Sequence, residues 1–183
     1  MLSSEKVQEF IVRAYETACN HGFHDVERSD EHLLMLVLSE IGEMVEADRK
    51  NRRANPEGFE KCVGVAYDDR FKDYVKDTLE DELADVCIRL FDFCGLRRLV
   101  PVVVDMHDDF DRLFGGLSVT EQCFALSSFV TNTVREPKMA NRIGMSLAFC
   151  VEFARYHGID LVWHIEHKME YNETRPIRHG KKY

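Results

Sequence analysis

The chain has 183 residues, of which 45% are apolar and 31% are charged, and its net charge is −9. This composition predicts a folded domain with a sizeable core and argues against disorder. The acidic charge argues against nucleic acid or an anionic membrane as partner, because both attract basic surfaces. No apolar run approaches the roughly 18 residues that cross a membrane, and the N-terminus lacks the apolar stretch of a signal peptide. We therefore expect a cytoplasmic protein.

Apolar residues recur at helical spacing, and no stretch shows the alternation of a β-strand. The pattern predicts an all-α fold, a bundle of about five or six helices that forms a single domain over residues 1–183. The predicted helices span residues 4–20, 30–51, 71–95, 118–135, 139–157 and 160–173. Their ends coincide with capping residues, namely Ser29 or Asp30, Gly95, Ser118 with Glu121, Gly158 and Asp160. Residues 52–68 and 101–117 are predicted to form loops.

The sequence contains six cysteines but no C-x-x-C pair. Four of them lie within apolar helical stretches, at Cys87, Cys94, Cys123 and Cys150. We therefore expect reduced thiols that act as small core residues.

Two pairs of segments resemble each other weakly, residues 82–96 with 145–159 and residues 31–45 with 121–135. The first alignment places Cys87 opposite Cys150. The acids of the first copy are lost in the second, where Glu40, Glu43, Glu82 and Asp85 become Val130, Thr133, Met145 and Ala148. This pattern predicts a pseudo-dimer in which residues 30–100 form a catalytic helix pair and residues 118–173 a degenerate second pair. The alternative is that any two amphipathic helix pairs look this similar.

Acidic residues at helical spacing are the main functional signal. One predicted helix carries three acids, each three residues from the next, at Glu40, Glu43 and Glu46. Another carries a mixed set at Glu82, Asp85, Arg89 and Asp92. Because such spacings place side chains on one face of a helix, two helices would each direct acids into apolar surroundings.

Buried carboxylates without a counter-charge are costly, so a cation is expected between these two helices. Mg²⁺ fits, because it binds carboxylate oxygens and fills its other positions with water and phosphate, and Mn²⁺ accepts similar ligands. We predict a metal site formed by Glu40, Glu43, Glu82 and Asp85. Glu46, Arg89 and Asp92 would lie around it, with Asp92 orienting Arg89 or a metal-bound water.

Two other arrangements of these acids compete with a magnesium site. The acids could lie on exposed faces, where Arg49 and Arg89 would form surface ion pairs. A di-iron bundle would require Glu-x-x-His on two helices, and no glutamate here has a histidine three residues later.

The C-terminal region reverses the charge of the chain. Residues 174–183 form a predicted basic tail, and Lys168, Asn172 and Arg175 precede or begin it at spacings of four and three. We expect these three side chains to bind phosphate oxygens, although a solvated tail would have the same composition.

Two motifs in this chain, SEIGEMVEADRK and DELADVCIRLFD, resemble the MazG-type all-α nucleoside triphosphate pyrophosphohydrolases. The family pattern is E-E-x-x-E, a spacer and E-x-x-D. Glu40 and Glu43 match its second and third acids, Glu82 and Asp85 match E-x-x-D, and Ser39 replaces the first acid. The HGFHD segment at residues 21–25 and the ending KMEYNETRPIRHGKKY resemble the longer phage and bacterial members. Residues 101–160 match only in outline.

The resemblance implies Mg²⁺-dependent hydrolysis of a (deoxy)nucleoside triphosphate to the monophosphate and pyrophosphate. It also implies a bundle whose helices pair across two copies, often between the subunits of a homodimer. Glu43 would orient the attacking water, with Glu40 one turn away as the next candidate. His24 or Phe23 could line a pocket for the base, whereas a role in the core is the commoner fate of a phenylalanine. The alternative from another class is a non-catalytic helical interaction protein that retains a vestigial metal site.

Overall fold

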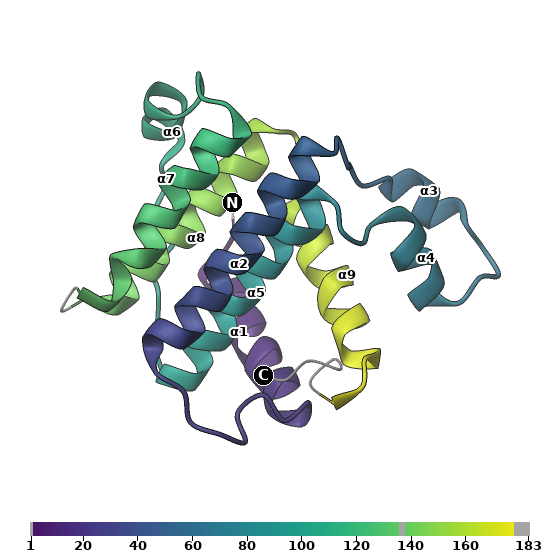
Figure 1. The fold of residues 1–183 in the computed structure, drawn as a ribbon, viewed down its shortest axis with the longest axis horizontal. Coiled ribbons are helices and arrows are strands. Elements are labelled where there is room, and N and C mark those ends of the chain that lie inside the picture. Colours follow the sequence, from purple (N-terminus) through teal and green to yellow (C-terminus); the bar gives the residue numbers. More distant parts are fainter. Residues whose placement is uncertain (1, 136–137, 178–183) are drawn as a thin grey trace.

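The computed structural model describes residues 2–135 and 138–177, and all regular structure in them is helical. The predicted all-α class is therefore confirmed (Figure 1). These residues contain nine α-helices and one 3₁₀ turn, more than the six predicted helices. The helices are α1 (Ser4–Asn20), α2 (Asp30–Arg49), α3 (Pro56–Lys61), α4 (Tyr67–Tyr74), α5 (Leu79–Arg97), α6 (His107–Leu113), α7 (Val119–Thr131), α8 (Met139–Tyr156) and α9 (Leu161–Thr174), and the turn is η1 (Thr133–Arg135).

The extra helices lie where the sequence predicted loops or one long helix. The predicted helix 71–95 is wrong at its start, because α4 ends at Tyr74 and α5 begins only at Leu79. Asp77 between them has a positive φ of 59°, and the Thr78 side chain accepts a hydrogen bond from the first turn of α5. Both features interrupt a helix. Two short helices, α3 and α6, occupy the predicted loops.

Other helix ends depart less from the prediction. The capping box of Ser118 and Glu121 is present at the start of α7, which ends at Thr131 and is followed by η1. The predicted stop at Gly95 is wrong, because α5 continues to Arg97 and the left-handed residue is Arg98. Gly95 is instead a close-packing position, since a Cβ there would lie 2.5 Å from the Cβ of Tyr15 on α1.

Helix α5 forms the centre of the bundle. It contacts α1, α2, α8 and α9, while α2 also packs against α7, and α7 packs against α8 (Figure 1). The exposure pattern of α5 is unusual, because its first turns bury three acids, Glu80, Asp81 and Glu82, together with apolar residues. The centre of the fold therefore holds the acidic motif that the sequence singled out.

The pairs α2–α5 and α7–α8 correspond to the two copies of the proposed internal repeat, and they lie against each other. Cys87 of α5 and Cys150 of α8, which the repeat aligns, are near enough that Cys87 contributes to the raised pKa of the Cys150 thiol. Contact between equivalent residues is what a pseudo-twofold axis would produce. The repeat itself stays a prediction. All six cysteines are free, and the four in apolar stretches are buried, as predicted.

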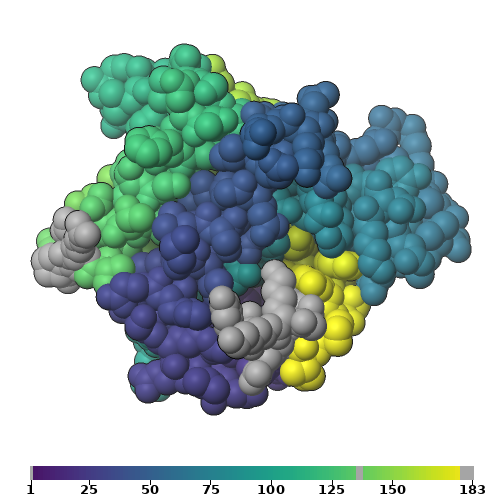
Figure 2. All heavy atoms as spheres, in the orientation of Figure 1, coloured from purple at the N-terminus to yellow at the C-terminus, as the bar shows by residue number. Residues whose placement is uncertain are grey.

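Helices α3 and α4 form a lobe that stands out from one side of the molecule (Figure 2). The lobe has a small core of its own, in which Phe71 stacks on Tyr171 of α9 at 4.5 Å between ring centroids. Phe59 of α3 also meets Trp163 of α9 edge to face. Among the described residues, no helix has the length and apolar character needed to cross a membrane.

Candidate metal centre

Two helices bring three of the predicted metal ligands together. Carboxylate oxygens of Glu40 on α2 and of Glu82 and Asp85 on α5 lie within 4.8 Å of one another. The residues Glu40 and Glu82 are each only 3% exposed, and Asp85 is half-buried. Oxygen ligands from carboxylates at this mutual distance are a donor set that suits Mg²⁺ or Mn²⁺.

The other two acids of α2 do not join this group. Glu43 is exposed, and its carboxylate lies outside the three-acid group, although its charge raises the pKa values of Glu40 and Glu82. Glu46 is also exposed and forms surface ion pairs with Arg49 and Lys50. Helix α2 therefore turns Glu40 toward α5, whereas Glu43 lies at the rim and Glu46 faces solvent.

A second acidic group adjoins the first and shares Glu82 with it. It consists of Asp77, Asp81 and Glu82, whose oxygens also lie within 4.8 Å of one another. Asp81 is almost fully buried and accepts a hydrogen bond from the backbone N–H of Asp77 at 2.9 Å. The sequence interpretation did not single out Asp81. Its position four residues before Asp85, on the same helix face, was an available signal.

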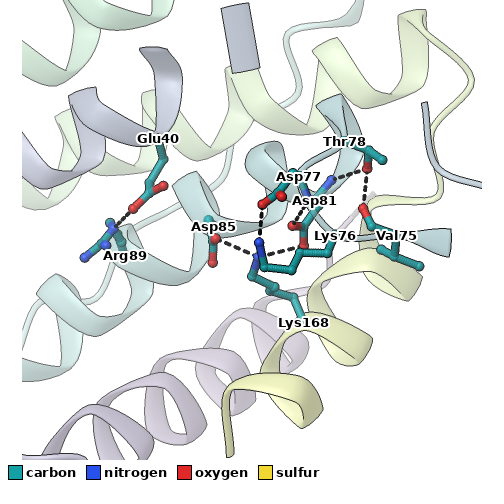
Figure 3. Close-up of polar contacts among 9 residues, drawn as sticks. All are labelled: Glu40, Val75, Lys76, Asp77, Thr78, Asp81, Asp85, Arg89 and Lys168. Carbon is teal, nitrogen blue, oxygen red and sulfur yellow. Dashed lines mark hydrogen bonds and ion pairs between the residues drawn. The ribbon is translucent and has the colours of Figure 1, made fainter. Parts of the chain in front are cut away.

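Lys168 of α9 connects the two acidic groups (Figure 3). Its Nζ lies 2.7 Å from Asp81 Oδ1 and 2.8 Å from Asp85 Oδ2, and the residue is only 4% exposed. The sequence predicted that this lysine binds substrate phosphate. The structure instead places it beneath the acids as an internal counter-ion, and it does not line the neighbouring pocket.

The pKa values of three of these acids are raised in spite of the nearby positive charge of Lys168. Burial, with the nearby charges of Asp81 and Asp85, raises the pKa of Glu82 to about 9. Burial also raises the pKa of Asp81 to about 6, against the opposing effect of Lys168. The pKa of Glu40 is raised too, mainly by burial and by the charge of Asp85. Each shift shows that the site disfavours another negative charge.

Charge balance indicates that the residues present fit a divalent cation. Arg89 forms an ion pair with Glu40, and Lys168 pairs with Asp81 and Asp85. Within the part of the chain that the structure describes, Glu82 has no ion-pair partner. Four carboxylates thus share two cationic side chains, and a bound divalent ion would supply the missing charge.

A pocket opens beside the acids and runs between α1, α2, α5 and α9. Its polar lining consists of Thr17, His24, Arg28, Glu40, Asp85, Arg89, Asp92, Asn172 and Arg175. Its apolar lining consists of Ala14, Ala18, Phe23, Leu33, Leu36, Ile88, Phe93 and Met169. A pocket with apolar walls, three arginines and acids at one end suits an amphipathic, anionic ligand.

Asn172 and Arg175 both line this pocket, whereas Lys168, which was expected on the same helix face, does not. Asn172 is 8% exposed, and in the described residues its Oδ1 atom has no hydrogen-bond partner. A buried amide oxygen without a partner is costly unless a ligand supplies a donor. Arg178, Lys181 and Lys182 of the predicted basic tail lie outside the described residues.

Residues of the loop between α1 and α2 complete the pocket at the end away from the three-acid group. His24 Nε2 donates a hydrogen bond of 2.7 Å to Asp92 Oδ1. Arg28 Nη1 donates to the backbone oxygens of Phe23 and Val26, which fixes the loop between α1 and α2. Asp92, which we predicted beside the metal, instead contacts His24 and lies two helical turns beyond Asp85.

The chain matches no protein-family model, no curated protein and no solved structure. The family resemblance thus rests on the two sequence motifs, and function must be argued from the site.

Proposed function

We propose that this chain is a metal-dependent pyrophosphohydrolase that converts (deoxy)nucleoside triphosphates to monophosphate and pyrophosphate, as the MazG-type resemblance implies. The observation that supports this proposal is the convergence of buried Glu40, Glu82 and Asp85 beside a pocket with arginines and apolar walls. Acids that bind a divalent ion next to cationic side chains are the usual elements of sites that act on phosphate anhydrides.

Glu40, Glu82 and Asp85 would hold Mg²⁺, or Mn²⁺ in its place. Such an ion neutralises phosphate charge and polarises the phosphorus–oxygen bonds of the substrate. Arg175 faces the pocket and would bind phosphate oxygens. Asn172 also faces it and would bind them through its amide N–H groups, whereas its unpaired Oδ1 atom would accept from a donor elsewhere on the ligand. Arg89 pairs with Glu40 in the structure and is near enough to contribute when that carboxylate is engaged by metal.

Glu43 is the residue that we propose to orient the attacking water. It is exposed at the rim of the acidic group, so water can reach its carboxylate. Its charge raises the pKa values of both Glu40 and Glu82, so it acts electrostatically on two of the proposed metal ligands. A carboxylate in that position can accept the proton of a water that attacks the α-phosphorus.

One structural observation favours the competing proposal, a helical interaction protein with a vestigial metal site. Lys168 already neutralises Asp81 and Asp85, so the fold tolerates part of its acidic group without any metal. Glu82 argues the other way, because a vestigial site would gain stability by losing a buried acid that has no counter-ion. The homodimer implied by the resemblance stays a prediction.

The deciding experiment is a product assay with each common ribo- and deoxyribonucleoside triphosphate in the presence of Mg²⁺ or Mn²⁺. We expect release of pyrophosphate in equal amount to monophosphate. Glu40→Gln and Glu82→Gln should each lower turnover at least about 100-fold, because each removes a charged metal ligand. Glu16→Gln, an exposed substitution on α1, is the matched control and should leave turnover unchanged.

Three results would contradict the proposal. Release of orthophosphate without pyrophosphate would indicate a phosphohydrolase of another kind. Wild-type turnover in both ligand variants would show that the acids are not the site. Absence of turnover with every triphosphate and either metal would favour the interaction protein.

A further inference from the structure

Helix α5 forms one wall of the pocket and carries polar groups at two positions along it. Asp85, Ile88, Arg89 and Asp92 all line it, and they follow each other at the spacings of a single helix face. The rise of an α-helix separates Asp85 from Asp92 by about 10 Å along the axis. This separation is comparable to the reach from the α-phosphate of a nucleotide to the far edge of its base.

The pocket changes character along that length. Beside Asp85 it is lined by Glu40, a proposed metal ligand, and by Arg89, which suits phosphate. Toward Asp92 it is lined by Phe23, Phe93 and Leu33, which offer flat or apolar surface, and also by Arg28, which donates a hydrogen bond to the backbone of Phe23. Aromatic and aliphatic walls stack well on a planar base, whereas they offer nothing to a phosphate.

Asp92 is an acidic group at this end of the pocket, next to its apolar walls. His24 donates to its Oδ1 atom at 2.7 Å, and the His24 ring stacks on Tyr15 at 5.6 Å between centroids. These contacts fix the carboxylate in place. The Asp92 side chain keeps 22% of its surface exposed, and the residue lines the pocket. A fixed carboxylate can accept hydrogen bonds and cannot donate them.

We propose that Asp92, positioned by His24, is a specificity-determining residue that accepts a hydrogen bond from an exocyclic amine of the substrate base. The favoured substrates are then nucleotides of cytosine or adenine, which carry an amine at the edge far from the sugar. Uracil and hypoxanthine carry a keto oxygen at the corresponding position, and that oxygen would face the carboxylate without a proton between them. This inference rests on the proposed function for the location of the phosphates.

The test compares nucleotides that differ in this edge alone. Binding of CMP against UMP, and of AMP against IMP, is measured by calorimetry with Mg²⁺ present. We expect CMP and AMP to bind at least about 10-fold more tightly than their keto partners. The corresponding triphosphates should show the same order in kcat/KM.

Asp92→Asn is the informative variant, because its amide can donate to a keto oxygen. We expect it to reduce the preference in both pairs at least several-fold, whereas Asp109→Asn on α6, an exposed control, should leave it unchanged. Equal binding within both pairs by the wild-type protein, or tighter binding of the keto partners, would overturn the inference. An unaltered preference in a folded Asp92→Asn protein would do the same.

The two proposals fail in distinguishable ways. A protein that hydrolyses triphosphates without distinguishing amine from keto bases retains the proposed function and refutes the role of Asp92. A protein that distinguishes CMP from UMP but releases no pyrophosphate refutes the hydrolase and retains the role of Asp92 in recognition. The wild-type comparison decides the matter even if Asp92→Asn does not fold.

Discussion

Glu82→Gln should make the metal-free protein more stable, although it removes a group that we place in the functional site. Burial and the charges of Asp81 and Asp85 raise the pKa of Glu82 from its ordinary value of 4.5 to about 9. The folded chain therefore keeps this proton at neutral pH, whereas the unfolded chain releases it above about pH 4.5. Ionisation then favours the unfolded chain increasingly as the pH rises from 4.5 toward 9.

The size of the effect follows from that difference in pKa. Ionisation of Glu82 stabilises the unfolded chain relative to the folded chain by about 1.4 kcal/mol for each pH unit above 4.5, which amounts to about 3 kcal/mol at pH 7. Glutamine has nearly the same shape and cannot ionise, so the variant removes this gain. For a chain of this size, 3 kcal/mol corresponds to a rise in Tm of roughly 6–12 °C.

The assay is urea unfolding at pH 5, 6, 7 and 8 in the presence of a metal chelator. The difference in unfolding free energy between Glu82→Gln and wild type should be small at pH 5 and should grow with pH. The matched control is Glu16→Gln on α1, where the side chain is exposed and the difference should stay near zero at every pH.

Addition of Mg²⁺ should reverse the ranking. Binding to the folded chain stabilises the wild-type protein according to its affinity, and the gain should increase with pH because the metal must displace the proton of Glu82. The variant has one ligand fewer and should gain less. A free-energy difference that does not change with pH in the absence of metal would refute the assignment of Glu82 as a desolvated acid. Equal stabilisation of both proteins by Mg²⁺ would refute its role as a ligand.

Three further predictions concern stability and are checked by urea unfolding. Lys168→Met should cost about 3–5 kcal/mol, because it leaves the buried Asp81 without its counter-ion, and a loss below 1 kcal/mol would contradict that pairing. Gly144→Ala should destabilise the protein by about 1–3 kcal/mol, since the new Cβ would lie 2.2 Å from the carbonyl oxygen of Val102. Gly42→Ala is the matched control, because a Cβ at that position meets open space, and it should stabilise the protein by up to about 1 kcal/mol. Burial lowers the pKa of His164 to about 4, so as the pH falls the unfolded chain protonates this histidine before the folded chain does. The wild-type protein should therefore lose about 3 kcal/mol of unfolding free energy between pH 6.5 and 4, and His164→Gln should not show this loss.

Helical periodicity predicted the fold class, because burial of one face dominates a small all-α domain. It could not predict the break between α4 and α5. Residues 71–95 contain no proline or other strong interruption, and the break depends on the left-handed conformation of Asp77 and the cap at Thr78. The short helices α3 and α6 were missed for the opposite reason, because each is too brief to show a period.

The acidic site was predictable to the extent that helix geometry determines it. Spacing placed Glu82 and Asp85 on one face of α5, and their proximity to Glu40 required only that α2 pack against that face. Spacing could not separate Glu40 from Glu43, because residues three apart differ by only about 60° around the helix axis. The rotation of α2 against α5 decides which of them is buried.

The position of Lys168 could not be derived from the sequence, since it depends on how α9 crosses α5. That position bears on how the chain folds before it meets a metal. Lys168 and Arg89 balance two of the four carboxylates, and the raised pKa of Glu82 indicates that a proton neutralises a third. Loss of that single proton is then the main electrostatic cost of binding a divalent ion. A proton on Glu82 keeps the metal-free protein foldable, while the two acids that share Lys168 preserve a net attraction for the cation.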